Sequence, residues 1–218
     1  RDLAPVKPFL IRVSPDTSAS FSTDEQVVTL VSEDLALLHL GNPLAVAYRW
    51  QTTLQRPSWQ DSAGIFFRLR KTGDATEGSS FTFQSIEVHE PPATPDGTMN
   101  APPNENAADS NGSSSVAVIW CAYDTKQQDR VVLAETSTQI SGHDEVTLEV
   151  IVGRSGFPEI YLNGEHLPPS KWTLSREARD FVAANLEQLP VFYSGRIGIV
   201  QHGQRTSIPN SKLMYLTD

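Results

Sequence analysis

Apolar and polar residues alternate with a period of two along most of this chain. The stretches "LAVAYRWQTTLQ" (44–55), "GIFFRLR" (64–70), "DEVTLEVIVG" (144–153) and "EIYLNGEHL" (159–167) show the alternation most clearly. A period of two is typical of β-strands that bury one face and expose the other. The pattern therefore predicts a chain of short strands that present polar residues on the side away from the core.

Two segments depart from simple alternation. "SSSVAVIWCAY" (113–123) is apolar on both faces, which predicts a strand that is covered on both sides. "SREARDFVAANLEQLP" (175–190) has helical spacing and ends at a proline. The pair Asn163-Gly164 predicts a tight hairpin. Many strands with one short helix predict an all-β fold, an antiparallel β-sandwich.

The chain divides into a leading segment and one domain. Residues 1–26 mix proline, serine and short apolar pieces, and we interpret them as a linker that lies against the body. Residues 27–218 form the predicted sandwich domain, and a disordered-like insertion over 91–115 interrupts it, because that stretch lacks the apolar residues needed for a core. The insertion carries oxygen-bearing side chains of the kind that bind calcium: Asp96, Asn104, Glu105, Asn106, Asp109 and Asn111. No EF-hand-like spacing is present, so a solvated loop is the preferred interpretation.

Charge and composition limit the classes of partner. The chain has 218 residues and a formal net charge of -9, without a basic stripe, which argues against nucleic acid. No segment approaches the roughly 18 consecutive apolar residues of a membrane span. The single cysteine, Cys121, excludes an internal disulfide and lies in an apolar run, as an inert buried thiol would. Because Arg1 opens the chain without an initiator methionine, we expect a piece of a longer protein.

Several common catalytic motifs are absent from the sequence. It contains no phosphate-binding glycine loop, dinucleotide fingerprint, GxSxG elbow, HExxH or CxxC. "EVHE" (87–90) is similar to the closely spaced carboxylates of β-sandwich glycosidases. Strand alternation, however, places His89 rather than Glu90 on the same side as Glu87. A two-carboxylate glycosidase is therefore not favoured.

Three stretches, in matching order and spacing, resemble the 3-keto-disaccharide hydrolase family, long catalogued as a domain of unknown function. "SAGIFFR" (62–68) resembles its N-S-G-I-F-x-R signature and "IYLNGEHL" (160–167) its LNG hairpin. "GRIGIVQHGQRTSIPNSKLMYL" (195–216) resembles its closing stretch. The chain departs from polar positions of the family at Ser62, Ser85, Val200 and Pro209. The resemblance implies a concanavalin A-like jelly roll of two antiparallel sheets, one of them open to a ligand.

The resemblance also implies a reaction on glycosides that carry a ketone at C3 of the sugar. The ketone acidifies the C2 hydrogen, so a base can remove it, the C1 substituent can leave and water can add. Such a site needs a base near C2 and a cation beside the developing enolate. We assign His202 or Glu87 as the base and Arg68 as the enolate stabiliser; Arg68 and His202 match family motif positions directly, and Glu87 does so under one alignment.

Alternation supplies further candidates for substrate binding. Six polar side chains point away from the apolar faces of their strands and would line one concavity if those strands are neighbours: Arg49, Gln51, Arg68, Glu87, His89 and His202. Trp59 and Trp172 lie in predicted loops, where an indole ring can stack on a sugar. Arg49, Gln51, His89 and Trp59 are therefore the predicted substrate-binding residues.

Two interpretations of function remain open. In the first, the domain recognises a carbohydrate or glycoside, with or without catalysis. In the second, it is a non-catalytic structural or partner-binding module of a larger bacterial surface protein. No cofactor and no metal are expected, the oligomeric state is undetermined, and we expect a periplasmic or extracellular location.

Overall fold

The computed structural model describes residues 9–12, 17–22, 27–41, 47–72, 80–91, 113–125, 129–141, 144–152, 158–176 and 196–216. They form two antiparallel sheets. The eight-stranded sheet has, in spatial order, β1 (Phe9–Arg12), β4 (Leu35–Gly41), β14 (Arg196–His202), β6 (Ala63–Thr72), β7 (Ser80–His89), β8 (Ser113–Asp124), β9 (Asp129–Ser141) and β13 (Thr173–Leu174). The seven-stranded sheet has β12 (Glu165–His166), β11 (Glu159–Leu162), β10 (Glu145–Val152), β5 (Tyr48–Gln55), β15 (Arg205–Tyr215), β3 (Val27–Val31) and β2 (Ser18–Ser22).

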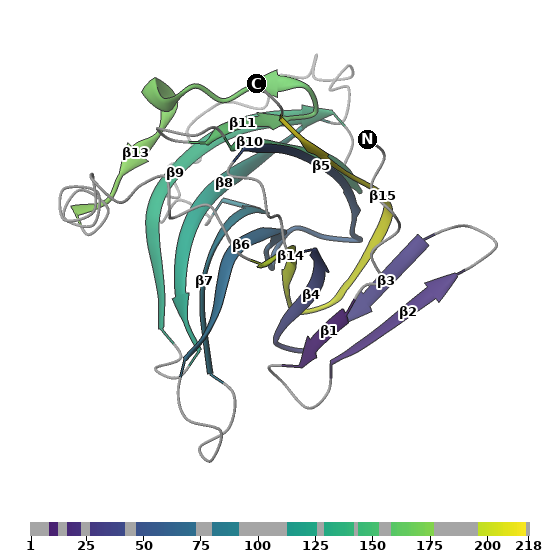
Figure 1. Cartoon of the computed structure of the whole chain (residues 1–218). Coiled ribbons are helices and arrows are strands. Elements are labelled where there is room, and N and C mark those ends of the chain that lie inside the picture. The colour runs from purple at the N-terminus through teal and green to yellow at the C-terminus, as the bar shows by residue number, and fades with distance from the viewer. Residues whose placement is uncertain are drawn as a thin grey trace.

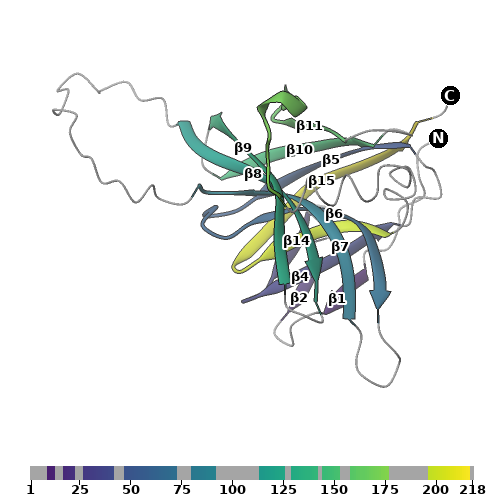
Figure 2. The same ribbon diagram turned by 90° about the vertical axis from the view of Figure 1, so that its left-hand side faces the viewer.

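The two sheets pack face to face. Figure 1 shows β9, β8, β7, β6, β14 and β4 side by side in one curved layer, with β5, β10, β11 and β15 in the other. Figure 2, turned by 90°, shows these same four strands of the second layer above the first. The predicted jelly-roll β-sandwich of two antiparallel sheets is confirmed. The alternating residues of each strand fill the space between the layers, among them Trp50, Leu54, Ile65, Ile86, Leu148 and Ile199.

A second apolar cluster lies on the outer face of the eight-stranded sheet. Its buried members are Leu37, Phe66, Leu69, Phe81, Phe83, Ile119, Cys121, Tyr123 and Val200. β8 contributes to both clusters, because Val116, Val118 and Trp120 face the interior while Ile119 and Tyr123 face outward. This agrees with the apolar character that the sequence shows on both faces of that strand.

A β-bulge in β6 changes the phase predicted from simple alternation. The pairing of β6 with β7 shifts between Phe67 and Arg70, and Arg68 has a φ of +64°. A bulge inserts one extra residue into a strand and reverses the faces that follow it. Alternation predicted that Leu69 shares the core side with Phe67, which is wrong: Phe67 lies in the interior, whereas Leu69 joins the outer cluster.

The first 26 residues contribute strands to both sheets. β1 pairs with β4, and β2 pairs with β3. These parts of the segment interpreted as a linker are thus integral to the sandwich. At the predicted hairpin, Asn163 and Gly164 have φ of +50° and +81°, as a tight turn between β11 and β12 requires.

Parts of the remaining predictions lie outside the described residues. The predicted helix, 175–190, lies outside the described residues except for Ser175 and Arg176. Most of the predicted insertion, 92–112, is also outside, including all six candidate calcium ligands, while 113–115 belong to β8. Among the residues that the structure describes, one short 3₁₀ helix, η1 (Pro169–Lys171), is present, and none is long and apolar enough to span a membrane.

Candidate functional site

Glu87 lies near the end of β7 on the outer face of the eight-stranded sheet. It is opposite Gly64 of β6 and Ile119 of β8. A Cβ atom at Gly64 would be 1.9 Å from the carbonyl oxygen of Ile86, so only glycine lets β6 and β7 approach this closely beside Glu87. The glycine of the "SAGIFFR" stretch therefore helps to set the backbone geometry around this carboxylate.

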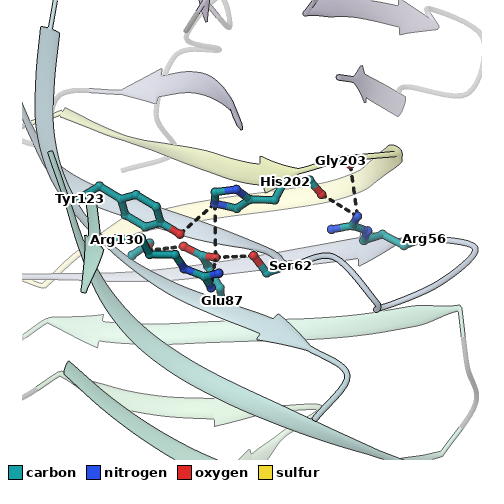
Figure 3. Close-up of polar contacts among 8 residues, drawn as sticks. Arg56, Ser62, Glu87, Tyr123, Arg130, His202 and Gly203 are labelled. Atoms are coloured by element: carbon teal, nitrogen blue, oxygen red, sulfur yellow. Dashed lines mark hydrogen bonds and ion pairs between the residues drawn. The ribbon is translucent and has the colours of Figure 1, made fainter. Parts of the chain in front are cut away.

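Four side chains contact the carboxylate of Glu87. Ser62 and Ser85 donate hydroxyl hydrogen bonds to it. Nη2 of Arg130 donates to Oε2 at 3.2 Å, and Nε2 of His202 lies 3.7 Å from the same oxygen. The Glu87 side chain is 0% exposed, whereas those of His202 and Arg130 are 22% and 37% exposed. Figure 3 shows Ser62, Arg130 and His202 converging on the carboxylate of Glu87.

Tyr123 of β8 completes the group by contacting His202. Its hydroxyl lies 2.8 Å from Nε2 of His202, and the two rings stack with centroids 5.5 Å apart. On its other side Tyr123 stacks on Phe83 at 4.5 Å, and the guanidinium of Arg130 lies 5.8 Å from the Tyr123 ring. The residues Ser62, Ser85, Glu87, Tyr123, Arg130 and His202 are called the Glu87 cluster below.

The carboxylate of Glu87 is held in its ionised form. Burial raises its pKa, but His202 when it is protonated, the permanent charge of Arg130 and the hydroxyl hydrogen bonds of Ser62 and Ser85 outweigh that effect. The net pKa of Glu87 lies below its ordinary value. Glu87 is therefore an anion at neutral pH, with Arg130 as its permanent counter-charge.

The imidazole of His202 is held in its neutral form. Burial lowers its pKa, and the positive charges of Arg130 and Arg56 act in the same direction. Glu87 and Asp34 oppose this effect without cancelling it. Because Nε2 faces both Tyr123 and the Glu87 carboxylate, the tautomer with a proton on Nε2 is favoured, and Nδ1 then keeps the lone pair.

The structure brings together two of the three predicted catalytic residues. Glu87 and His202 lie on neighbouring parts of one face, 3.7 Å apart. Arg68 does not belong to the described contacts of Glu87; it occupies the bulge of β6 and is 8% exposed. The cation beside Glu87 is Arg130 instead.

Two of the predicted substrate-binding residues lie on the other sheet. Arg49 and Gln51 belong to β5, and Arg49 donates to Glu149 at 2.8 Å on the outer face of the seven-stranded sheet. The prediction of one shared concavity is wrong for these two residues, because period-two alternation gives the face of a strand but not its sheet. His89 follows Glu87 on the outer face of β7, opposite Ala117, and is not among the side chains that contact Glu87.

Of the two predicted aromatic platforms, Trp59 is buried and Trp172 is half-buried. Trp59 is 5% exposed, packs in the interior cluster and lies 5.7 Å from the guanidinium of Arg56. Its ring is thus covered by protein, which contradicts its prediction as a sugar-stacking residue. Trp172 packs partly against the interior, and its indole nitrogen donates to the carbonyl of Leu167 at 3.1 Å.

Sequence reasoning did not predict four members of the cluster: Ser62, Ser85, Tyr123 and Arg130. Tyr123 and Arg130 are cross-strand partners in the pairing of β8 with β9. The phase of β8, in which Tyr123 shares a face with Cys121, could have revealed Tyr123, but nothing in the local sequence marks Arg130. Within the described ranges, no group of three or more histidine, cysteine or acidic residues could hold a metal ion.

Comparison with known proteins gives a likeness of fold. No family model matches the chain, and no curated protein matches it. A protein of unknown function with a galectin-like fold from Bacillus subtilis aligns with 95% of this chain and 89% of its own, at a TM-score of 0.51 and 9% identity. A carbohydrate-binding module from Bacillus subtilis aligns with 94% of each chain at a TM-score of 0.49 and 10% identity. The kappa-carrageenase from Pseudoalteromonas carrageenovora aligns with 90% of this chain and 82% of its own, at a TM-score of 0.47 and 6% identity.

Proposed function

We propose that this domain recognises a glycoside at the Glu87 cluster. The observation that carries the proposal is the convergence of an anion, a cation, a phenol and a neutral imidazole from four strands of one sheet. Arg130 and His202 are the members whose side chains reach solvent, while Glu87 and Tyr123 hold them from behind. Arginine has five N–H donors, and charge-assisted hydrogen bonds to sugar hydroxyls are among the stronger polar contacts.

The sequence resemblance supports the same class of ligand. Ser62 and Gly64 belong to the stretch that resembles the N-S-G-I-F-x-R signature, and His202 belongs to the closing stretch. Both stretches contribute to the Glu87 cluster or its immediate backbone. Glycosides, including those with a ketone at C3, are therefore the substrates to test first.

Binding is tested by titration of the protein with a panel of glucosides, galactosides and their 3-keto forms, followed by calorimetry or NMR. Wild type is expected to bind at least one member saturably. His202→Gln and Arg130→Lys should bind it about tenfold more weakly or worse, because each loses a hydrogen bond to the ligand. Arg49→Lys is the matched control, since Arg49 pairs with a glutamate on the other sheet. The proposal would be contradicted if wild type bound no sugar of the panel saturably, or if all four proteins bound with equal affinity.

A second candidate function is elimination on 3-keto-glycosides. The observation that favours it is a neutral His202 beside Arg130 and Glu87. Nδ1 of His202 would take the C2 proton, and the electron pair of that C–H bond would pass into the C3 ketone as an enolate, stabilised by Arg130. The C1–O bond then breaks as the C1–C2 double bond forms, the leaving oxygen takes a proton, and water adds across that double bond.

Catalysis is tested with a nitrophenyl 3-keto-glucoside in deuterium oxide. Two readouts are followed: release of nitrophenolate and exchange of the C2 hydrogen for deuterium. Wild type is expected to show both, and His202→Gln to lose both by at least about 10²-fold, the usual contribution of a general base. Binding without either readout in wild type would leave recognition in place and remove catalysis.

A further inference from the structure

The turn that follows His202 carries the chain from one sheet to the other. β14 ends at His202 in the eight-stranded sheet, and β15 begins at Arg205 in the seven-stranded sheet. Gly203 and Gln204 both have φ of +56°. A Cβ atom at Gly203 would lie 2.5 Å from Oδ2 of Asp61, so the turn fits closely against its surroundings. Small changes in this turn will therefore move His202.

Arg56 holds this turn from the end of β5. Its Nη2 donates to the carbonyl oxygens of His202 at 3.0 Å and Gly203 at 3.3 Å. The backbone N–H of His202 in turn donates to the carbonyl oxygen of Ser62 at 2.8 Å. Both backbone polar groups of His202 are thus bonded outside its own strand. Figure 3 shows its side chain directed at Tyr123 and Glu87, while Arg56 lies at the turn in the right part of the picture.

Arg56 is a buried cation that the charges of Asp61 and Glu87 attract and that is hydrogen-bonded to the turn. The residue is 2% exposed, and burial lowers its pKa to about 10. Within the described part of the chain, neither Nε nor Nη1 of Arg56 has a hydrogen-bond acceptor, and the guanidinium rests 5.7 Å from the Trp59 ring. Burying a charge is costly unless hydrogen bonds compensate it. The only hydrogen bonds that its guanidinium donates to described residues go to the two carbonyls of the turn.

We propose that Arg56 is a positioning residue that fixes the His202 turn and thereby sets the orientation of the imidazole toward Tyr123 and Glu87. The consequence for ligand affinity rests on the proposed glycoside function, but the orientation of His202 does not. Arg56 makes this contribution through the backbone of residues 202 and 203. It needs no contact with the ligand.

The orientation is tested in the free protein by long-range ¹H–¹⁵N spectra of the five histidines. The His202 signals are assigned by their loss in His202→Gln. In wild type the two ring nitrogens should differ widely in shift, as expected of one tautomer fixed by Tyr123 and Glu87. In Arg56→Met the difference should shrink by about half or more, because a loosened imidazole exchanges between tautomers.

Two further variants test whether the effect of Arg56→Met comes from the lost hydrogen bonds to the turn or only from the lost positive charge. Arg56→Lys keeps the charge and part of the hydrogen bonding, so its His202 signals should lie between those of wild type and Arg56→Met. Arg205→Met removes an exposed positive charge three residues after His202 without touching the two carbonyls, and should leave the His202 signals unchanged. Thermal melts identify which variants fold. His202 signals identical to wild type in every folded Arg56 variant would overturn the proposal.

Glycoside titration of the same proteins gives the functional readout. Arg56→Met should bind about tenfold more weakly or worse, comparable to His202→Gln, whereas Arg205→Met should match wild type. If wild type binds no glycoside but the spectra change as expected, the proposed function fails and the positioning role of Arg56 stands. Wild-type affinity in a folded Arg56→Met protein would overturn the affinity part of the proposal.

Discussion

Polar side chains are arranged differently on the outer faces of the two sheets. On the seven-stranded sheet, polar groups of β5 pair with those of the adjacent β10, as in Arg49 with Glu149 at 2.8 Å and Gln55 with Glu145 at 2.6 Å. On the eight-stranded sheet, side chains from β7, β8, β9 and β14, together with Ser62 just before β6, gather around a carboxylate that is 0% exposed. One face carries separate local pairs, and the other carries a single connected cluster.

The difference predicts how each face responds to the loss of one member. A local pair at the surface contributes little, because water can replace either partner. In a connected buried cluster, removing one member leaves the others desolvated and unpaired, which costs much more than the lost contact itself. Matched substitutions on the two faces therefore test whether the Glu87 cluster is a built site.

The largest effect is expected from Glu87→Gln. Removing the negative charge leaves Arg130 without its counter-charge, and the free energy of unfolding should fall by about 3 kcal/mol, the lower end for broken buried pairs, since Arg130 is partly exposed. Urea denaturation at pH 7 measures it. Glu145→Gln, the equivalent change in the exposed pair that Glu145 forms with Gln55 on the other face, should cost far less, and equal losses would contradict the contrast between the faces.

The next largest effect is a loss of stability on acidification. It should begin at a pH above the range in which ordinary carboxylates titrate. The folded-state pKa of His202 lies below its ordinary 6.5, so the unfolded chain binds the proton first and stability falls as the pH drops from about 6.5. The groups that face His202 and shape this behaviour are Glu87, Arg130, Asp34, Arg56 and Tyr123. The pKa of Glu87 lies below its ordinary 4.5, so its contribution is lost below about 4.5.

Each group can contribute a slope of at most about 1.4 kcal/mol per pH unit. Denaturation curves collected between pH 8 and pH 3 measure the slopes. His202→Gln should remove the upper part of the loss, and Glu87→Gln the lower part. Variants that keep the wild-type pH profile would show that these two groups do not carry it.

A smaller effect is expected from Tyr123→Phe. The substitution deletes the hydroxyl that contacts His202 but keeps the stacking on Phe83, so unfolding should become easier by about 1 kcal/mol. Thermal denaturation followed by circular dichroism measures the change. A loss as large as that of Glu87→Gln would mean that the phenol, and not the carboxylate, organises the cluster.

The smallest effect is expected from Thr147→Val on the seven-stranded sheet. Its hydroxyl lies 3.2 Å from that of Thr53, in one of the local pairs. Valine suits a strand equally well, so stability should change by about 0.5 kcal/mol or less and glycoside affinity should stay at the wild-type value. Weakened glycoside binding in this variant would indicate that the ligand binds the seven-stranded sheet and not the Glu87 cluster.

Much of the fold could be predicted from the sequence, because the alternation of apolar and polar residues is a local property of each strand. The phases of β5, β7 and β10 predicted that Trp50, Ile86 and Leu148 face the interior, and they do. The bulge at Arg68 escaped this reasoning, since it depends on how β6 pairs with β7 and β14. The strands β1 and β2 escaped it too, because each is short and takes its order from a partner strand.

The sequence predicted only part of the candidate site. Glu87 and His202 stood out through their strand phase and the resemblance of their stretches, and they lie 3.7 Å apart. Arg49 carried the same kind of alternation signal, yet it lies on the other sheet. Arg130 carried no signal, although it provides the cation that contacts Glu87.

Outside the bulge of β6, the sequence by itself determined which side of a strand is apolar, because neighbouring side chains along a regular strand point to opposite faces. The tertiary structure decided which strands became neighbours, and hence that Arg130 and Tyr123 stand beside Glu87 and His202 while Arg49 lies on the other sheet. Strand pairing joins residues far apart in the chain through backbone hydrogen bonds that every residue type except proline can make in full. The identity of a strand's partners is therefore encoded in the packing of the whole sandwich and not in any one stretch.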